Sequence, residues 1–175
     1  MVCAVDDRHA HRLVAQRLCG EKTTKATAYD GDMGLHADII ACMSSEALKP
    51  GLTGRAELVV RDEHTAPRVG SGLVHVLATP VMINLFEAAA LDAVDKHLPA
   101  GYQSLGTVLN VRHIAATPVG MKVFSTATIV KIEGRTVFLA VEAKDEMELI
   151  GDGTHERVVV NVEKFSMRVK RKLAT

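Results

Sequence analysis

The sequence LVHVLATPVMINLFEAAALDAV, residues Leu73–Val94, is the longest nearly apolar stretch of the chain. It is long enough to cross a bilayer, but strongly polar or charged side chains interrupt it, and charges at mid-bilayer depth are costly. These side chains are His75, Asn84, Glu87 and Asp92. The pattern therefore predicts a buried helix of a protein that does not enter the membrane.

Thr79 and Pro80 mark the expected start of this helix. A threonine hydroxyl can cap a free backbone N–H of the first turn, and proline at the first helical position loses no hydrogen bond and fixes φ. We therefore predict a helix from Pro80 to about Lys96, capped by Thr79. The residues that follow leave no broad polar face, which is typical of a helix surrounded by protein.

Glu87 is the exceptional residue of this helix. Helical spacing places it on one face with Ile83 and Leu91, so its carboxylate is expected to be partly desolvated. Carboxylates in such surroundings are suited to acid–base chemistry. The structural alternative is that Glu87 reaches solvent or pairs with an arginine or lysine of a strand.

The composition fits one globular domain that does not bind nucleic acid. The chain has 175 residues, of which 47% are hydrophobic and 24% are charged, and this length supports a sizeable core. Its 21 basic and 21 acidic side chains balance, and it has no tryptophan. A surface that reads nucleic-acid bases is therefore not expected, whereas a small anionic ligand is compatible with this balance.

Residues 1–42 differ from the rest of the chain. They show no sustained period of 2 or 3.6 residues, and they contain all three cysteines, Cys3, Cys19 and Cys42. These cysteines lack metal-binding spacing and are expected to be reduced thiols of a cytoplasmic protein. The amino end has no apolar stretch of the kind that a secretory signal needs. We interpret residues 1–42 as a poorly ordered, dispensable leader and residues 43–175 as the functional domain.

The domain is predicted to contain one strand, the helix and then four more strands. Residues 55–61 are β-prone, and residues 62–72 form a loop that leads to the helix. After Gly101, three short turn signals divide four β-prone segments, which predicts antiparallel neighbours. These turn signals lie at residues 117–120, 133–135 and 151–153.

His113 lies on an apolar face of the first of these four strands, together with Leu109, Val111 and Ala115. A histidine in this position is either a hydrogen-bonded core residue or a catalytic group.

The last β-prone segment changes phase after Val162, and Phe165 and Val169 continue the apolar pattern at odd positions. We predict one strand with a bulge near residues 163–164. Its end is strongly basic and is either a solvated tail or a contact for nucleotide phosphates.

Together these elements predict an α+β protein with the hotdog fold, in which a curved antiparallel sheet wraps around one long central helix. The edge strands of such a sheet carry unpaired backbone groups, and two protomers that pair edge to edge would cover them. We therefore expect a homodimer, with a tetramer as the alternative assembly.

From Leu48 to Lys172, about seven-tenths of its length, the chain resembles the fluoroacetyl-CoA thioesterase-like family of hotdog proteins. The resemblance rests on several short motifs taken together. They are ATP (78–80) ahead of the helix with Glu87, SLGT (104–107), VRHIAATPVG (111–120), EGR (133–135), IGDGTHERVVV (150–160) and EKF (163–165).

The resemblance implies that the protein is an acyl-CoA thioesterase. The positions that match the family's catalytic residues are Thr79, Glu87 and His113. The positions that match its substrate-lining residues are Gly106, Arg157 and Leu73.

These positions imply specific roles in hydrolysis. Glu87 would attack the thioester or act as general base, and His113 would orient or protonate groups of the tetrahedral intermediate. Thr79 would hydrogen-bond the carboxylate or the thioester, and a backbone N–H near Gly106 would stabilise the oxyanion. The reaction would need no metal and no cofactor, because CoA is part of the substrate.

Two further expectations concern assembly and specificity. Thr79 and Glu87 lie ~12 Å apart along an ideal helix, so a working site is expected to combine residues of two protomers. The loop of residues 69–78 has no Phe, Tyr or Trp, whereas a fluoroacetyl-selective enzyme would be expected to close an aromatic lid there. The expected substrate is therefore a short or small acyl-CoA.

Two other functions are compatible with the fold. A non-catalytic acyl-CoA sensor is the first alternative, although the sequence shows no helix-turn-helix beside the domain. A hydratase is the second, and it would need an aspartate paired with a histidine along one segment, a pattern that is missing around His113. The fold alone does not choose between these functions.

Overall fold

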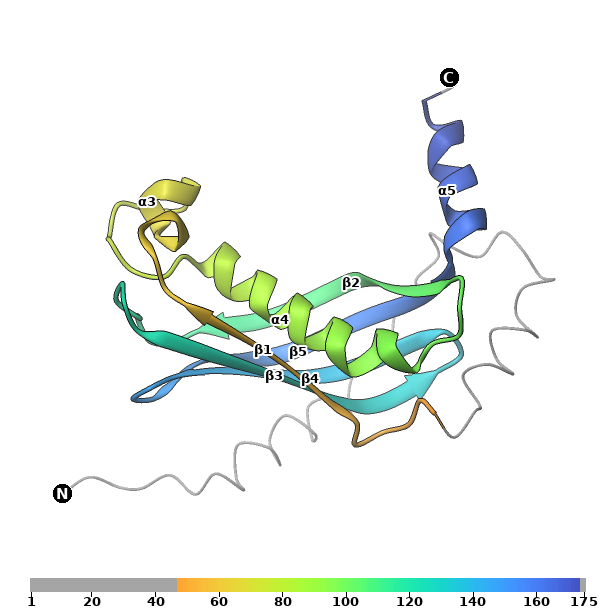
Figure 1. Ribbon diagram of the computed structural model, residues 1–175, viewed down its shortest axis with the longest axis horizontal. Coiled ribbons are helices and arrows are strands. Elements are labelled where there is room, and N and C mark those ends of the chain that lie inside the picture. Colours follow the sequence, from red (N-terminus) through yellow and green to blue (C-terminus); the bar gives the residue numbers. More distant parts are fainter. Residues whose placement is uncertain (1–46, 174–175) are drawn as a thin grey trace.

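The computed structural model describes residues 47–173, which form a curved five-stranded antiparallel sheet around one long helix (Figure 1). This is the predicted hotdog fold. Its strands are β1 (Thr53–Val59), β2 (Tyr102–His113), β3 (Lys122–Glu133), β4 (Thr136–Asp145) and β5 (Leu149–Asn161). Its helices are the α-helices α3 (Ala66–Val69), α4 (Thr79–Val94) and α5 (Val162–Arg171) and the 3-10 helices η3 (Asp62–His64) and η4 (Asp95–His97). The interpretation of residues 1–42 as a leader lies outside the described residues and stays a prediction.

The strand order is β1-β3-β4-β5-β2. The predicted four-stranded meander is therefore wrong in one respect, because β2 pairs with β5 and not with β3. Both sides of β3 are already occupied, by β1 and by β4, so β2 reaches the sheet at its opposite edge.

The turn predicted at residues 151–153 is also wrong, because these residues lie inside β5. The chain reverses instead just before β5, where Asp145 accepts hydrogen bonds from the backbone N–H groups of Met147 and Glu148 at 2.8 and 2.9 Å. Gly151 has a packing role, since a Cβ there would lie 2.6 Å from the sulfur of Met82 on α4. Helix α4 therefore approaches β5 closely at this glycine.

Helix α4 supplies the centre of the core and lies along the inner face of the sheet (Figure 1). Its buried residues are Met82, Leu85, Phe86, Ala89, Ala90, Ala93 and Val94. Strand β1 passes close to the helix at Gly54, because a Cβ there would overlap the backbone of Ala89 and Ala93. Small residues on both elements thus set the distance between helix and strand.

The opposite side of α4 is not covered within the chain. Asn84, Ala88 and Leu91 are exposed, so the helix predicted to be surrounded by protein has an open strip in a single protomer. Two of these three side chains, Ala88 and Leu91, are apolar, and all three are exposed to solvent.

The start of α4 also differs from the prediction. The N-cap is Ala78, no side chain caps the first turn, and Thr79 is the first helical residue. The Thr79 hydroxyl is not the cap because it hydrogen-bonds His113 at the end of β2.

The predicted bulge near residues 163–164 is wrong, because a helix begins there. Val162, Phe165 and Val169 recur at helical spacing, and the side-chain oxygen of Asn161 accepts from the N–H of Lys164 at 3.1 Å as the N-cap. Helix α5 stands away from the sheet (Figure 1). Among residues 47–173, no helix is long and apolar enough to span a membrane.

Candidate active site

The residues predicted for the site fall into two groups within one chain. Thr79 and His113 form a pair where α4 begins and β2 ends. Glu87, two turns further along α4, lies with Gly106 of β2 and Arg157 of β5. Leu73 lies in the loop ahead of α4 and is 95% exposed.

In this pair, the hydroxyl oxygen of Thr79 is hydrogen-bonded to Nδ1 of the His113 ring at 2.9 Å. Burial lowers the pKa of His113 below its ordinary value of 6.5, and a hydrogen bond with the backbone of Ala115 acts in the opposite direction. Nε2 of His113 is buried and has no hydrogen-bond partner among residues 47–173. A buried ring nitrogen without a protein partner can hydrogen-bond a ligand.

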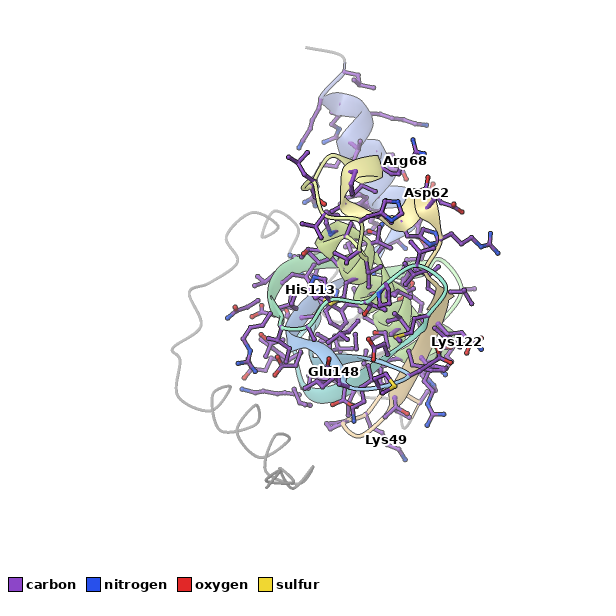
Figure 2. All side chains as sticks on the ribbon, turned by 90° about the vertical axis from the view of Figure 1, so that its left-hand side faces the viewer. Lys49, Asp62, Arg68, His113, Lys122 and Glu148 are labelled. Atoms are coloured by element: carbon purple, nitrogen blue, oxygen red, sulfur yellow. The ribbon has the colours of Figure 1, made fainter. Side chains whose placement is uncertain are left out.

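Asp62 holds the loop that carries Leu73. Asp62 accepts from Arg68 Nε at 2.6 Å and lies 2.7 Å from Nε2 of His75, a residue of the loop. These two hydrogen bonds, led by that of His75, lower the pKa of Asp62. Figure 2 looks at this end of the molecule and shows Asp62 and Arg68 side by side on the same end as His113.

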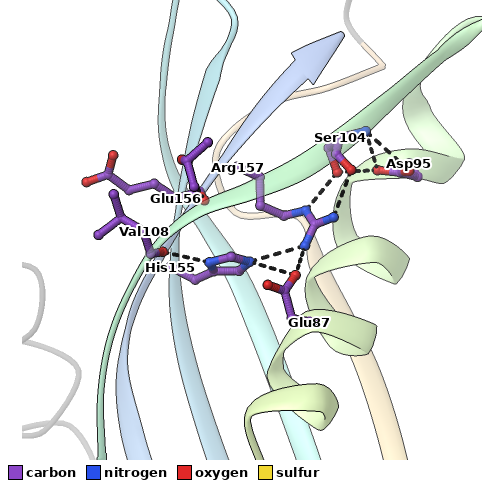
Figure 3. Close-up of polar contacts among 8 residues, drawn as sticks. Glu87, Asp95, Ser104, Val108, His155, Glu156 and Arg157 are labelled. Carbon is purple, nitrogen blue, oxygen red and sulfur yellow. Dashed lines mark hydrogen bonds and ion pairs between the residues drawn. The ribbon is translucent and has the colours of Figure 1, made fainter. Parts of the chain in front are cut away.

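The second group is centred on the carboxylate of Glu87 (Figure 3). Its Oε2 accepts from Arg157 Nη1 in an ion pair and lies 3.2 Å from Nε2 of His155. The Glu87 side chain is 32% exposed, as the expectation of partial desolvation required, whereas that of Arg157 is only 3% exposed. No described residue donates a hydrogen bond to Oε1, the other oxygen of Glu87.

Arg157 is held from the other side by β2 (Figure 3). Its Nε donates to the hydroxyl of Ser104 at 2.8 Å, and its Nη2 donates to the carbonyl of Ser104 at 2.9 Å. The hydroxyl of Ser104 in turn donates to Asp95 of η4. The guanidinium is therefore fixed in place, and Glu87 provides the charge that a buried arginine needs.

Gly106 leaves the space into which Glu87 points. It pairs with Arg157 across β2 and β5, and the register of the two strands shifts immediately after it. A Cβ at Gly106 would lie 2.5 Å from Oε1 of Glu87 and 3.0 Å from the His155 ring. Oε1 thus faces bare strand backbone.

His155, Ser104 and Asp95 also belong to this group, and none of them was predicted as a site residue from the sequence. His155 and Arg157 alternate onto the same face of β5, so two polar residues that point inward from one strand were the available signal. Ser104 and Asp95 carried no such signal, because their roles depend on the position of the guanidinium. Within residues 47–173, no group of three or more His, Cys, Asp or Glu side chains is arranged to hold a metal ion.

Comparison with known proteins gives a consistent result. The model of a family described as "Fluoroacetyl-CoA-specific thioesterase" matches residues 60–163. A curated fluoroacetyl-CoA thioesterase of Streptantibioticus cattleyicolor is 44% identical over 97 residues, which are 55% of this chain and 70% of that protein.

Solved structures agree with this match. The fluoroacetyl-CoA thioesterase structure superposes with a TM-score of 0.68 at 36% identity, over 71% of this chain and 97% of that one. A variant of the same protein in complex with acetyl-CoA gives a TM-score of 0.67 at 35% identity, over 71% and 98% of the two chains. A thioesterase superfamily member of Thermus thermophilus gives a TM-score of 0.69 at 29% identity, over 74% and 96%.

Proposed function

Because this chain belongs to the fluoroacetyl-CoA-specific thioesterase family and is therefore a thioester hydrolase, we propose that it hydrolyses a short acyl-CoA to the free acid and CoA, with Glu87 as the reacting group. One observation carries this proposal. Arg157 donates to Oε2 of Glu87, and His155 lies beside that oxygen, whereas Oε1 faces Gly106 without a protein hydrogen bond. A carboxylate fixed by one oxygen presents the other in a constant position, as a nucleophile or general base requires.

The chemistry follows from the free oxygen of Glu87. As a general base, Oε1 takes a proton from water, the water oxygen bonds to the thioester carbon, and the carbon–sulfur bond breaks to release CoA thiolate. As a nucleophile, Oε1 bonds to the carbon itself and the carbon–sulfur bond breaks to release CoA thiolate. Water then hydrolyses the resulting anhydride to the free acid and regenerates the Glu87 carboxylate. The backbone N–H groups near Gly106 are the candidate donors to the developing oxyanion.

The Thr79–His113 pair supplies the second half of the proposed site. If the Thr79 hydroxyl donates to Nδ1, the neutral ring carries its proton on the unpartnered Nε2, which can then donate to the thioester or the leaving sulfur. Because Thr79 is two helical turns from Glu87, we propose that the pair of one protomer works with Glu87 of its partner in a homodimer. A second copy would also cover the exposed strip of α4 and the β2 edge of the sheet.

The test is hydrolysis of a panel of acyl-CoAs by the purified full chain, with a thiol-trapping dye to detect CoA. Acetyl-CoA comes first because a relative has been solved with it. The Glu87→Gln variant should hydrolyse the best substrate ~100-fold more slowly, the lower range for loss of a general base, and should still bind it. Its stability should fall by ~2 kcal/mol, less than for a fully broken buried pair, because the amide oxygen can still accept from Arg157.

Glu57→Gln is the matched control, since Glu57 is exposed and its ion pair with Lys122 is 3.4 Å long. An exposed pair contributes little, so this variant should keep both activity and stability. Full activity of Glu87→Gln would contradict the proposed mechanism. Binding of acyl-CoA without any release of thiol would instead favour the alternative of a non-catalytic acyl-CoA sensor.

A further inference from the structure

His155 is a buried titratable residue for which the proposed chemistry has no role. It lies on β5, two residues before Arg157, and its side chain is 0% exposed. Both of its ring nitrogens have polar neighbours (Figure 3). Their identity determines what the ring can do.

Nδ1 of His155 carries a proton. It lies 2.8 Å from the carbonyl oxygen of Val108, which can only accept a hydrogen bond. Val108 directly follows the register shift between β2 and β5. This contact fixes the tautomer of the neutral ring and leaves Nε2 as an acceptor.

Nε2 of His155 lies 3.2 Å from Arg157 Nη1 and 3.2 Å from Oε2 of Glu87. In the neutral ring, Nε2 therefore accepts from Nη1, and Nη1 also donates to Oε2. Ser104 takes the other side of the guanidinium, at Nε and Nη2. The ring thus closes the set of contacts that holds Arg157, and through it Oε2, in one position.

We propose that His155 is a positioning residue for hydrolysis, and this inference rests on the proposed function. By accepting from Arg157, it keeps Oε2 of Glu87 engaged, so that Oε1 is the oxygen that reacts. A histidine that only filled the core would need its contact with Val108 and no particular group at Nε2. The two nitrogens can therefore be tested separately.

The test compares His155→Asn with His155→Gln in the full chain. The asparagine amide N–H lies near the former Nδ1 and keeps the donor to Val108, whereas the longer glutamine places its carbonyl oxygen near the former Nε2. With acetyl-CoA or the best substrate of the panel, His155→Asn should lower kcat ~100-fold with KM nearly unchanged, because a misplaced reacting group costs about this much. His155→Gln should retain at least about tenfold more kcat than His155→Asn.

Thermal unfolding of the two variants separates positioning from packing. A purely structural role predicts the reverse order, with His155→Asn more stable and more active, because it keeps the contact with Val108. Wild-type kcat in His155→Asn, or an equal loss of kcat in both variants, would overturn the proposal.

A measurement without any change at His155 covers the case in which these variants do not fold or the wild type hydrolyses none of the thioesters. In nitrogen NMR of the histidine rings of the wild-type chain, His155 should carry its proton on Nδ1. Glu87→Gln should shift its Nε2 resonance and leave Nδ1 nearly unchanged. An Nε2 resonance that ignores Glu87→Gln would overturn the proposal whatever the activity, whereas an inactive wild type with the expected shift would contradict only the proposed function.

Discussion

At the scale of single residues, the candidate site depends on what surrounds one carboxylate. Arg157 balances the charge of Glu87, and the missing side chain of Gly106 leaves room for its Oε1. The same glutamate is therefore both the partner of a buried arginine and the proposed reacting group. The sequence left a structural ion pair and a catalytic role as alternatives for Glu87. In the proposed function both hold, with Oε2 in the ion pair and Oε1 in the proposed catalytic role.

Gly106→Ala tests this arrangement. The new methyl group would lie 2.5 Å from Oε1 of Glu87, so the carboxylate must move. We expect kcat to fall by ~100-fold, as for other displacements of about 1 Å, and stability to fall by ~1–3 kcal/mol. Gly72→Ala is the control, because a Cβ there meets only Ala66 at an ordinary 3.5 Å. An active and stable Gly106→Ala variant would show that Glu87 does not need this space.

His113 gives a prediction for the pH dependence of stability. Burial lowers its pKa in the folded chain below 6.5, so the unfolded chain takes up a proton at higher pH than the folded one. The contribution of the neutral ring to stability is therefore complete above pH 6.5 and is lost as the pH falls through the folded pKa. His113→Asn should unfold with a weaker pH dependence than the wild type in urea titrations between neutral and mildly acidic pH. Parallel pH profiles of the two proteins would refute this.

At the scale of elements, the contact between α4 and β1 sets the geometry of the site. Gly54 on β1 meets the backbone of α4 at Ala89 and Ala93, and such close contact fixes how the helix lies across the sheet. Because Glu87 lies on the same helix, the position of its carboxylate depends on this contact. Packing far from the reacting oxygen thus contributes to its placement.

Gly54→Ala should therefore be strongly destabilising. Its Cβ would overlap helix backbone, which cannot turn away as a side chain can, so we expect a loss of ~3 kcal/mol or more, at or above the usual range for overpacking. Urea denaturation would measure the loss, again against Gly72→Ala. A loss below that of Gly106→Ala would mean that β1 can move away from the helix without cost.

At the scale of the whole molecule, the candidate site of a single chain consists of two separate groups of residues. The pair Thr79 and His113 has no hydrogen bond to the Glu87 group among the described residues, and Leu91 on the exposed strip of α4 is 40% exposed. Strand β2 forms one edge of the sheet, where Val108 is 47% exposed. An open strip on the central helix and a long free edge are the surfaces that a second copy would cover.

Complementation between two inactive variants tests the shared site. If Thr79 of one protomer serves Glu87 of the other, a heterodimer of Thr79→Ala and Glu87→Gln contains one intact site. Random exchange of equal amounts should then restore about one quarter of wild-type activity, because half of the dimers are mixed and each has one of two sites intact. Sedimentation at micromolar concentration should show the dimer. An active monomer, or a mixture that stays inactive although its subunits exchange, would rule out the shared site.

The sequence alone determined the parts of this protein that depend on neighbours a few residues apart. The apolar run from Leu73 to Val94 specified the central helix, and alternation along the strand that became β2 placed His113 on its less exposed face correctly. Glu87 could be identified from the sequence because a charged side chain is unusual in the middle of an apolar helix. The family resemblance added the expected catalytic and substrate-lining roles of these positions.

Only the tertiary structure decided which of these residues meet. Thr79 hydrogen-bonds a residue 34 positions away instead of capping its own helix, and Glu87 contacts His155 and Arg157 across 68 and 70 positions. Contacts of this kind depend on the strand order that places β2 beside β5 and on how closely α4 packs onto the sheet. Local periodicity carries no information about either, because many strand orders and packing distances satisfy the same pattern of buried and exposed residues.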